Sequence, residues 1–584
     1  MDSEKRKKYR LGLAMFLKTA RTLIFTVLVF RLGHWVWETA PWERIEIPEV
    51  PVLAEEEPPA EEPAPEEEET PVYYPPPVRA MELREIRRPT YMIYYGVVDD
   101  AVIEEAVKYD IVILYPRPGE LTREKVWKIQ QGGAYVLSYL SVGEDQRTNG
   151  MTAEQMLQDG RFTKDGTGPR VDPRAPGTKS LDGIEALGAP SPGGSGFASF
   201  YLDDNDHDGL PDFNQSFRCA YTNIGDPSWF DTLNSMTLDG PDGVFGIREI
   251  LTDDYGRGLG CDGLLLDTID TCAPNEYTGD EDPNRTRFEW TAPGVVRFME
   301  RLKEEYPDKY LLQNRGLFFY NYQYPHCAFS PREYIDFLLF ESYMLDSNPD
   351  ALYQEAHFQG NKHVYRPKIL AEANRPDGFR ILSLGYAEGP EEYRLRETLL
   401  GNTEEGLDIL LEDMRQAEDE SGFSHYITDR DLMLPNHFVL DHRETLDSAP
   451  PCWTSVHHRS DVYPYEAPSP RTGIGQAEPA AGGVMVRWDV AMDKNGVDYT
   501  LYYQKAPFDF ERDPDLTAAE RLTLVPDIGE GYAYQAPPES YPYQALVEGL
   551  DPGETYYFVI RAKDRSPAGN EEKNTVVAEA VPLG

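Results

Sequence analysis

Eight short apolar segments recur between residues 90 and 430, and helical or turn-forming stretches separate them. Apolar runs of this length, without polar alternation, are typical of parallel strands buried on both faces. Strands that alternate with helices form an open doubly wound sheet or a closed barrel, and eight units favour a (β/α)8 barrel, an α/β fold. The expected strands are Tyr91–Tyr95, Asp110–Tyr115, Ala134–Leu140, Gly263–Asp267, Tyr310–Gly316, Phe337–Glu341, Arg380–Tyr386 and one near His425–Thr428.

Two of these segments end on an acid. Gly263–Asp267 ends on Asp267, and Phe337–Glu341 ends on Glu341. Barrels of this kind carry their chemistry at the C-terminal ends of the strands. Cleavage of a glycosidic bond requires one carboxylate near the anomeric carbon and one protonated acid near the leaving oxygen. The two acids are therefore the candidate catalytic pair, and the alternative for either alone is a structural hydrogen-bond acceptor.

Aromatic and polar residues near the other strand ends are candidates for binding sugar. Tyrosine rings offer a flat face to the C–H groups of a sugar ring, although packing in the barrel core is the alternative role. The candidate substrate-binding residues are Tyr95, Tyr139, Glu144, Asp270, Asn314, Tyr343 and Tyr386.

Four motifs in this region together resemble glycoside hydrolase family 114. They are Tyr139–Glu144, Cys261–Asp270, Asn314–Gly316 and Phe340–Tyr343, and the resemblance covers about residues 90–438. That family and its relatives include endo-α-1,4-polygalactosaminidases. The resemblance implies a polysaccharide substrate, Asp267 as nucleophile, Glu341 as acid/base and no cofactor for catalysis. The chain departs from the family pattern at Leu265-Leu266, where the family is more polar, so the identity of the sugar stays open.

A long insertion, about residues 145–245, separates the third and fourth expected strands. It is rich in Gly, Pro and Asp, and it would lie over the rim that carries the chemistry. Within it, Asp204, Asp206, Asp208 and Asp212 alternate around Gly209 with the spacing of a calcium loop. A structural Ca²⁺ is expected there. Gln215 stands where such loops carry Glu, and a solvated acidic loop is the alternative.

The pattern changes after about Pro450 to alternating apolar and polar residues, typical of antiparallel strands in a sandwich. Leu550–Tyr556 has the spacing of a tyrosine corner. With Asp564–Glu571, this region resembles a fibronectin type III domain over residues 465–584. Such a domain would serve as a spacer or as a glycan-binding accessory. The strands are expected at Val484–Trp488, Tyr499–Tyr503, Tyr543–Val547 and Tyr556–Ala562.

The N-terminus predicts membrane attachment. Residues 1–38 start with a basic cluster and continue with an apolar run that is strongest from Thr22 to Phe30. A basic flank before such a run favours a cytoplasmic N-terminus and an exported remainder, held by an uncleaved signal anchor. The alternatives are a helix lying on the membrane surface and, after cleavage, a secreted protein.

The remaining boundaries follow from composition. Residues 39–80 form a linker, and residues 48–78 within it contain ten Glu, ten Pro and no Lys or Arg, so this part cannot bury a core. The barrel domain is expected at 81–445, and a second linker at 446–464. The formal net charge is −46, which argues against nucleic acid as a partner because phosphate binding needs a basic surface.

Two other functions compete with this interpretation. A catalytically silent glycan-binding or cell-surface scaffold would keep the cleft but not need both acids. A metal hydrolase lacks support, because the ten His show no metal-ligand spacing. The five Cys show none either, although Cys261 and Cys272 could pair in an exported protein.

Overall fold

The structure is a computed structural model of the whole chain, and it divides into two compact units, Met1–Tyr73 and Tyr74–Gly584. The described residues are 73–79, 81–86, 88–163, 167–173, 187–193, 196–274, 288–320, 331–345, 355–373, 377–387, 404–443, 450–453, 472–493, 495–528, 541 and 543–583. The expected membrane segment at 1–38 and most of the linker at 39–80 lie outside them. Within these ranges, no helix has the length and apolar character needed to cross a membrane.

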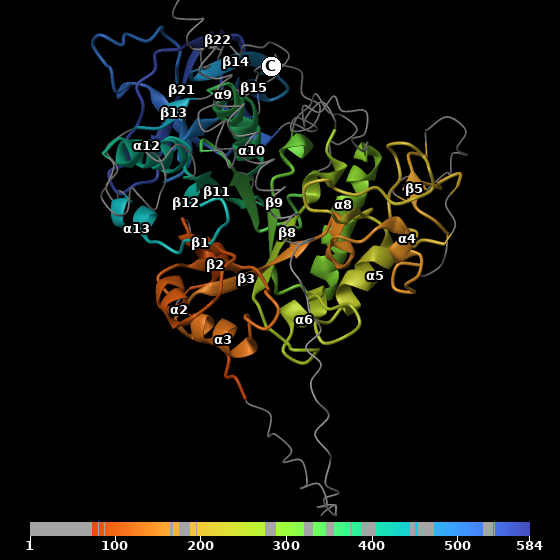
Figure 1. Cartoon of the computed structure of the whole chain (residues 1–584). Coiled ribbons are helices and arrows are strands. Elements are labelled where there is room, and N and C mark those ends of the chain that lie inside the picture. Colours follow the sequence, from red (N-terminus) through yellow and green to blue (C-terminus); the bar gives the residue numbers. More distant parts are fainter. Residues whose placement is uncertain are drawn as a thin grey trace, which may run out of the picture. The chain divides into compact units, whose positions relative to one another are not determined.

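Eight parallel strands form one sheet in the order β1-β2-β3-β8-β9-β10-β11-β12, and they confirm the predicted (β/α)8 barrel (Figure 1). Every residue of β1 and β2 is buried, as expected where helices cover the outside and side chains fill the inside. The strands are β1 Tyr91–Tyr94, β2 Ile111–Leu114, β3 Tyr135–Ser141, β8 Gly263–Asp267, β9 Tyr310–Asn314, β10 Phe337–Glu341, β11 Arg380–Tyr386 and β12 Ser424–Thr428.

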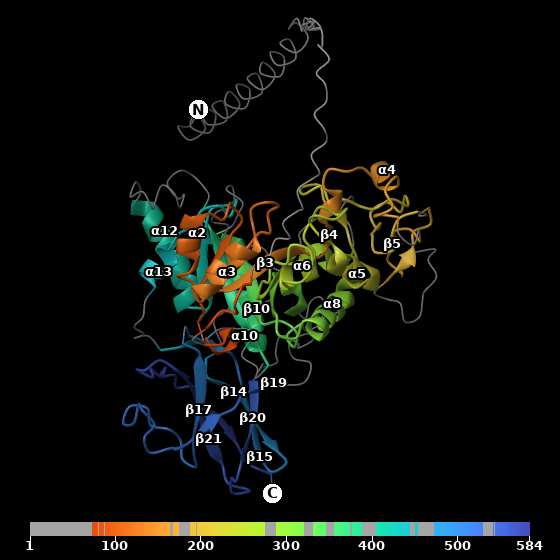
Figure 2. The same cartoon turned by 90° about the horizontal axis from the view of Figure 1, so that it is seen from below.

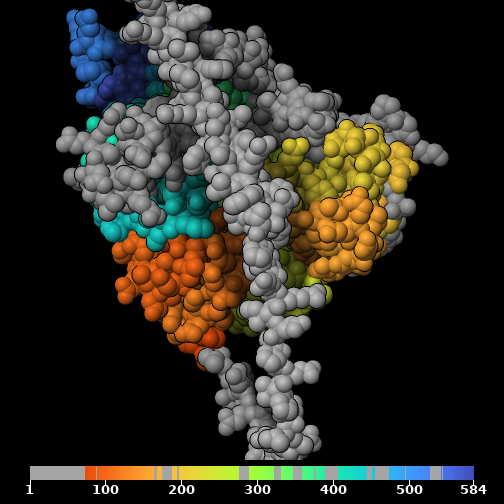
Figure 3. All heavy atoms as spheres, in the orientation of Figure 1, coloured from red at the N-terminus to blue at the C-terminus, as the bar shows by residue number. Residues whose placement is uncertain are grey.

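The first and last strands meet and nearly close the barrel. The ring of Tyr91 on β1 packs against that of Tyr426 on β12, with centroids 5.7 Å apart. Just beyond β1, the backbone N–H of Tyr95 donates to the carbonyl of Leu432 at 2.7 Å. The Tyr109 hydroxyl also donates to the carbonyl of Asn436, and both residues are buried. On the surface, the orange and cyan parts of the barrel lie against each other (Figure 3).

The helices begin where their sequences supply caps. Asp99 accepts a hydrogen bond from Val102 N ahead of α2, and Thr122 accepts one from Lys125 N ahead of α3. The main helices of the barrel are α2 Asp100–Ala106, α3 Arg123–Gln131, α8 Ala292–Glu305, α9 Glu355–Gly360, α10 Arg366–Ala373, α12 Glu404–Met414 and α13 Phe438–His442.

The predicted insertion leaves the barrel at the C-terminal end of β3. Its first strand, β4, pairs with β7, and β5 pairs with β6, each in an antiparallel ladder. In Figure 2, β4, α4, β5 and α5 gather on one side of the barrel. These elements are β4 Glu144–Asp145, α4 Ala153–Met156, β5 Arg170–Val171, β6 Ala189–Pro190, β7 Ala220–Tyr221, α5 Pro227–Ser235 and α6 Ile247–Leu251.

The C-terminal part is an all-antiparallel sandwich of two four-stranded sheets, β14-β15-β20-β19 and β18-β17-β21-β22. The Tyr556 hydroxyl accepts a hydrogen bond from Asp551 N at 3.1 Å, the contact expected of a tyrosine corner. The fibronectin type III assignment stays a prediction. The strands are β14 Ile474–Ala480, β15 Gly483–Trp488, β17 Val497–Gln504, β18 Glu520–Leu524, β19 Asp527–Ile528, β20 Tyr543–Glu548, β21 Tyr556–Asp564 and β22 Ala578–Ala580.

The cysteine pairing considered for the strand β8 region does not form. Cys261 and Cys272 are both buried, and no disulfide joins them. They lie in the apolar core, where a reduced cysteine behaves as a small hydrophobic residue.

Candidate active site

A cavity of about 680 Å³ opens at the C-terminal ends of the barrel strands. Side chains in a strand alternate between the two faces, so every second residue of a barrel strand points inward. Strands β1, β8, β10 and β11 each contribute an apolar residue to the floor and, at or just beyond the strand end, a polar one to the rim. The floor residues are Ile93, Leu265, Leu339 and Leu384, and the rim residues are Tyr95, Asp267, Glu341 and Tyr386.

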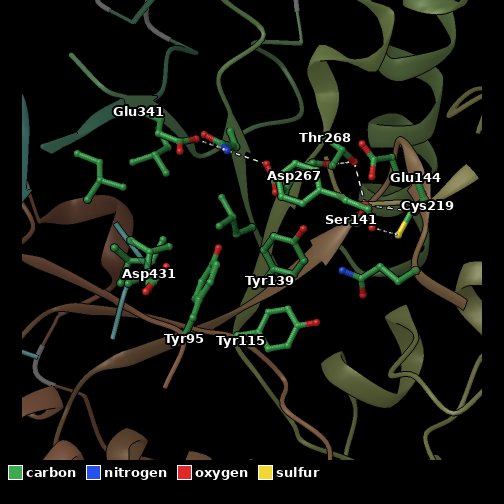
Figure 4. Close-up of a pocket in the computed structure, with 18 of the residues that line it drawn as sticks. Tyr95, Tyr115, Tyr139, Ser141, Glu144, Cys219, Asp267, Thr268, Glu341 and Asp431 are labelled. Atoms are coloured by element: carbon green, nitrogen blue, oxygen red, sulfur yellow. Dashed lines mark hydrogen bonds between the residues drawn. The ribbon is translucent and has the colours of Figure 1, made fainter. Parts of the chain in front are cut away.

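Both predicted catalytic acids lie on this rim, and one amide group joins them. The side-chain nitrogen of Asn314, at the end of β9, donates to Asp267 Oδ1 at 2.7 Å and to Glu341 Oε2 at 2.8 Å (Figure 4). Only the nitrogen end of the amide fits between two acceptors. The ends of three consecutive strands therefore build one acid–amide–acid unit.

The shared donor limits the distance between the two carboxyl groups. The sum of the two hydrogen-bond lengths is the largest separation that the accepting oxygens can have, about 5.5 Å. Carboxyl groups lie about 5–5.5 Å apart in retaining glycosidases and about 6.5–9.5 Å apart in inverting ones. The two accepting oxygens therefore cannot lie farther apart than the separation typical of retaining enzymes.

The backbone is strained directly after each of these three residues. Thr268, Arg315 and Ser342 follow Asp267, Asn314 and Glu341, and their φ angles are 63°, 52° and 56°. Residues with a side chain rarely adopt this left-handed conformation, and such strain concentrates at functional sites.

Hydrogen bonds from the neighbouring strand hold the strained turn at Thr268. Its hydroxyl accepts from Gly143 N at 2.7 Å and from Val142 N at 3.2 Å. A Cβ on Gly143 would lie 2.2 Å from the Thr268 carbonyl oxygen, so only glycine fits beside the turn.

The pair is electrostatically coupled. Burial in the cavity and the nearby Glu341 carboxylate raise the pKa of Asp267. The hydrogen bond from Asn314 lowers this pKa and offsets part of the rise. The Tyr386 hydroxyl donates to Glu341 Oε1 at 2.6 Å. A carboxyl pair of this kind can hold a proton at a pH where separate acids would be ionised, as acid catalysis requires.

Three tyrosines form an aromatic wall on the opposite side of the cavity from Glu341 (Figure 4). The rings of Tyr95, Tyr115 and Tyr139 contact one another with centroids 5.2 to 5.5 Å apart. Burial and the neighbouring Asp267 carboxylate raise the pKa of Tyr139, so its hydroxyl stays protonated and able to donate. Tyr95 and Tyr139 are predicted substrate-binding residues that the structure places in the cavity.

Glu144 lies at the edge of the cavity, where the insertion starts. Its side chain is 5% exposed, and Asn214 Nδ2 donates to its Oε1 at 2.7 Å. Burial, against the lowering effect of this hydrogen bond, raises the pKa of Glu144 to about 7. The carboxyl group is therefore a third proton-holding acid beside the pair.

We expect Glu144→Gln to stabilise the protein at alkaline pH. The folded-state pKa of about 7 exceeds the ordinary value of 4.5, so the contribution of Glu144 to stability is full below the ordinary value and is lost as pH rises through about 7. Above that pH, ionised Glu144 lowers the free energy of unfolding by up to about 3 kcal/mol. Glutamine avoids this loss and can still accept the hydrogen bond from Asn214. In thermal melts, the Tm of Glu144→Gln should exceed that of the wild type by more at about pH 8 than at about pH 5. An equal gain at both pH values would contradict the titration of Glu144.

Two predicted substrate-binding residues do not reach the cavity. The Asp270 carboxylate accepts from Gly316 N at 3.1 Å and from Arg315 Nε at 3.2 Å, so it supports the strained turn after β9. Tyr343 is fully buried, and its hydroxyl contacts Ser421 and Arg366. Both residues follow their strand end by two or three positions, where the chain has already turned away from the barrel axis.

The cavity also contains residues that the sequence interpretation missed. Tyr115 ends the second predicted strand, so the strand-end argument could have included it. Arg430 and Asp431 come from the turn after β12, and Asn149 and Cys219 come from the insertion. No local sequence signal marks these four, because only the folded insertion and turn bring them to the rim.

The acidic loop of the insertion differs in detail from the predicted calcium loop. Carboxylate oxygens of Asp203, Asp206 and Asp208 lie within 4.8 Å of one another. Asp204 instead accepts from Trp290 Nε1 and from Asp172 N, each at 2.6 Å. Asp212 accepts from the backbone N–H of Asp204 at 2.9 Å. The structure thus brings Asp203 into the cluster, and it directs Asp204 and Asp212 into hydrogen bonds within the insertion and its surroundings.

Comparisons with known proteins give distant similarities in structure alone. No protein-family model matches the chain, and no curated protein is similar to it in sequence. The glycoside hydrolase domain of PelA from Pseudomonas aeruginosa is 17% identical with a TM-score of 0.34, over 59% of this chain and 97% of that one. A family GH13_31 enzyme is 14% identical with a TM-score of 0.27, over 51% of this chain and 59% of that one. The maltogenic α-amylase AmyB from Thermotoga neapolitana is 8% identical with a TM-score of 0.29, over 80% of this chain and 100% of that one. Similarity this distant carries no argument about activity, which rests on the cavity itself.

Proposed function

We propose that this chain is a glycoside hydrolase that cleaves a polysaccharide with Asp267 and Glu341 as its catalytic pair. The observation that carries the proposal is the single amide nitrogen of Asn314 held between the two carboxyl groups at the mouth of the barrel. Two acids at this separation, beside an aromatic wall, suit an oxocarbenium-like transition state. The reaction needs no cofactor.

The reaction would proceed in two steps with retention of configuration. In the first, the Asp267 carboxylate attacks the anomeric carbon while protonated Glu341 donates its proton to the leaving oxygen, and a glycosyl ester forms on Asp267. In the second, the Glu341 carboxylate takes a proton from water, the water oxygen attacks the anomeric carbon, and Asp267 leaves. The roles assigned to the two residues come from the family resemblance.

The charge of the cavity favours a substrate with amino groups. Four carboxyl groups line it, from Glu144, Asp267, Glu341 and Asp431, against the one guanidinium of Arg430. A sugar ammonium group would offset part of this negative charge. Together with the family resemblance, this charge leads us to propose a galactosamine-type polymer with α-1,4 links, cleaved internally, as the substrate.

A glycan-binding protein without catalysis is the alternative function. The structure offers less support for it, because a binding site gains nothing from a second carboxyl group that raises the pKa of Asp267. Strained turns after three successive functional residues also favour a site that must position groups for chemistry.

We also propose that the protein is anchored in a membrane with the barrel outside the cytoplasm. The support is the basic and apolar segment at 1–38, followed by the acidic proline-rich linker. Protease added to intact cells should then cut within residues 48–78 and release the barrel. Full-length protein in the cytosolic fraction would contradict this location.

Hydrolysis by the purified full-length protein tests the activity. We expect new reducing ends from partly deacetylated galactosamine polymers, and fewer from N-acetylated or neutral polysaccharides. The double variant Asp267→Asn/Glu341→Gln is the negative control, since it keeps the shape of both side chains. Binding of a polymer without release of reducing ends by the wild type would favour the glycan-binding alternative.

A further inference from the structure

Three of the five aspartates in the acidic loop at residues 203–212 form a cluster, in which two are exposed and one is buried. Asp206 and Asp208 are exposed, whereas the Asp203 side chain has no exposed surface. Their carboxylate oxygens approach within 4.8 Å of one another. Three negative charges this close repel one another strongly, and more so where one is removed from water.

The buried aspartate is only half satisfied by the protein. Asp203 Oδ2 accepts hydrogen bonds from Ser191 Oγ and from Gly209 N. Asp203 Oδ1 is buried and has no hydrogen-bond partner among the described residues, and the same holds for Oδ1 of Asn205, two residues further along the chain. A buried carboxylate oxygen without a donor is costly, because it has lost water and gained nothing in return.

We propose that Asp203, Asp206 and Asp208 bind a divalent cation, and that the cation is Ca²⁺. A cation would offset the repulsion among the three carboxylates and provide the missing partner for the buried oxygen. All three donors are hard oxygen ligands, which suit Ca²⁺ or Mg²⁺ rather than a transition metal. Ca²⁺ fits better, because it accepts irregular loop geometry and further oxygens from carbonyls and water, whereas Mg²⁺ requires a near-ideal octahedron.

The loop is shaped for this purpose by residues that do not bind the cation. His207 lies between the two exposed ligands and Gly209 directly follows them, and their φ angles of 55° and 88° turn the chain at both points. Asp204 fixes the loop to the Trp290 indole, and Asp212 accepts from Asn205 N at 3.2 Å. Asp204 and Asp212, which the spacing of a calcium loop predicts as ligands, are thus positioning residues. The set of ligands starts one residue earlier, at Asp203.

The cation site is connected to the wall of the cavity. Tyr221 N donates to the Asp212 carbonyl at 2.9 Å, and Tyr221 pairs with Glu144 between β7 and β4. Asn214, just after the loop, donates to Glu144. Binding of Ca²⁺ should therefore order the part of the insertion that holds Glu144 at the cavity edge.

Metal binding by the full-length protein tests the proposal without reference to hydrolysis. After removal of metal with chelator, Ca²⁺ should bind at one site by calorimetry and raise Tm, since it binds only the folded loop. Tb³⁺, used as a luminescent substitute, should be sensitised by Trp290, and excess Ca²⁺ should remove the signal. Asp206→Asn and Asp208→Asn should each weaken Ca²⁺ binding at least about tenfold, and Trp290→Phe should lower the signal of the protein saturated with Tb³⁺.

The test relies on variants of Asp206 and Asp208 because Asp203 is buried, and the Asp203→Asn variant can fail to fold. Asp253→Asn, at an exposed aspartate outside the loop, is the matched control and should bind Ca²⁺ like the wild type. Wild-type affinity in both Asp206→Asn and Asp208→Asn, or no Tm change with Ca²⁺, would overturn the site. A larger Tm increase with Mg²⁺ than with Ca²⁺ at equal concentration would overturn the choice of cation.

Discussion

Asp267→Asn and Glu341→Gln are each expected to lower kcat for polysaccharide hydrolysis by about 10⁴-fold or more while leaving the fold intact. Each substitution keeps the shape of the side chain and removes either the nucleophilic oxygen or the transferable proton. Both amides can still make a hydrogen bond with Asn314, so the Tm should change little. Initial rates of reducing-end release, with circular dichroism as a check on folding, would measure the effect.

The other end of strand β8 supplies a matched control. Asp262 stands immediately before the strand and accepts from Arg79, Gln130 and Val136 N, far from the rim in the strand direction. Asp262→Asn should lower Tm and leave kcat within about threefold of the wild type. Equal losses of kcat in Asp262→Asn and Asp267→Asn would show that the effect comes from the strand and not from the site.

Azide rescue distinguishes the roles of the two acids. In a nucleophile variant such as Asp267→Gly, azide should attack in place of the carboxylate and give a glycosyl azide of inverted configuration. In Glu341→Ala, azide should attack the glycosyl ester and give the retained configuration. The opposite stereochemistry would exchange the roles within the pair. Full activity in either variant without azide would remove that residue from the mechanism.

Asn314→Asp should be the next most damaging change, with a loss of about 10²- to 10³-fold in kcat/KM. The substitution replaces the shared donor with a third acceptor between Asp267 and Glu341. Repulsion from a third carboxyl group would raise the pKa of Asp267 further, so the activity that remains should shift toward higher pH. The pH profile of kcat/KM would show both the loss and the shift.

A buried asparagine elsewhere in the barrel is the control for this prediction. Asn436 donates to the carbonyl of Ile427 at 2.9 Å and does not line the cavity. Asn436→Ala should lower Tm and leave the pH profile unchanged. If Asn314→Asp lowers Tm as Asn436→Ala does but keeps its kcat/KM and pH profile, Asn314 has only a structural role.

The strand pattern was predictable because it depends on short-range properties of the chain. A strand buried on both faces must be apolar along its length, so segments such as Gly263–Asp267 are visible without any knowledge of their neighbours. All eight predicted strands are present, and most bounds agree within one residue. The two acids were visible for the same reason, since each interrupts an apolar run where a parallel strand ends.

The choice among polar residues near the rim needed the tertiary structure. Asp267 and Asp270 are three residues apart, yet only Asp267 continues the inward alternation of β8, while Asp270 follows the left-handed turn at Thr268. Asp203 and Asp204 are adjacent and chemically identical, and the surroundings decide that Asp203 joins the carboxylate cluster while Asp204 contacts Trp290. Spacing cannot separate such cases, because small changes in backbone angles reverse the direction of a side chain.

The sequence by itself determined the barrel, the sandwich and the positions of two strand-end acids. Burial and side-chain alternation produce patterns of apolar and polar residues that are visible within each short segment. Only the tertiary structure decided that Asn314 joins the two acids, that Tyr115 and Tyr139 face them, and that Asn214 of the insertion donates to Glu144. These residues lie far apart in the chain, and their contacts depend on how strands close into a barrel and on where an insertion of about 100 residues folds back. The residue types of the site can therefore be identified from short stretches of sequence, whereas its geometry depends on contacts between distant parts of the chain.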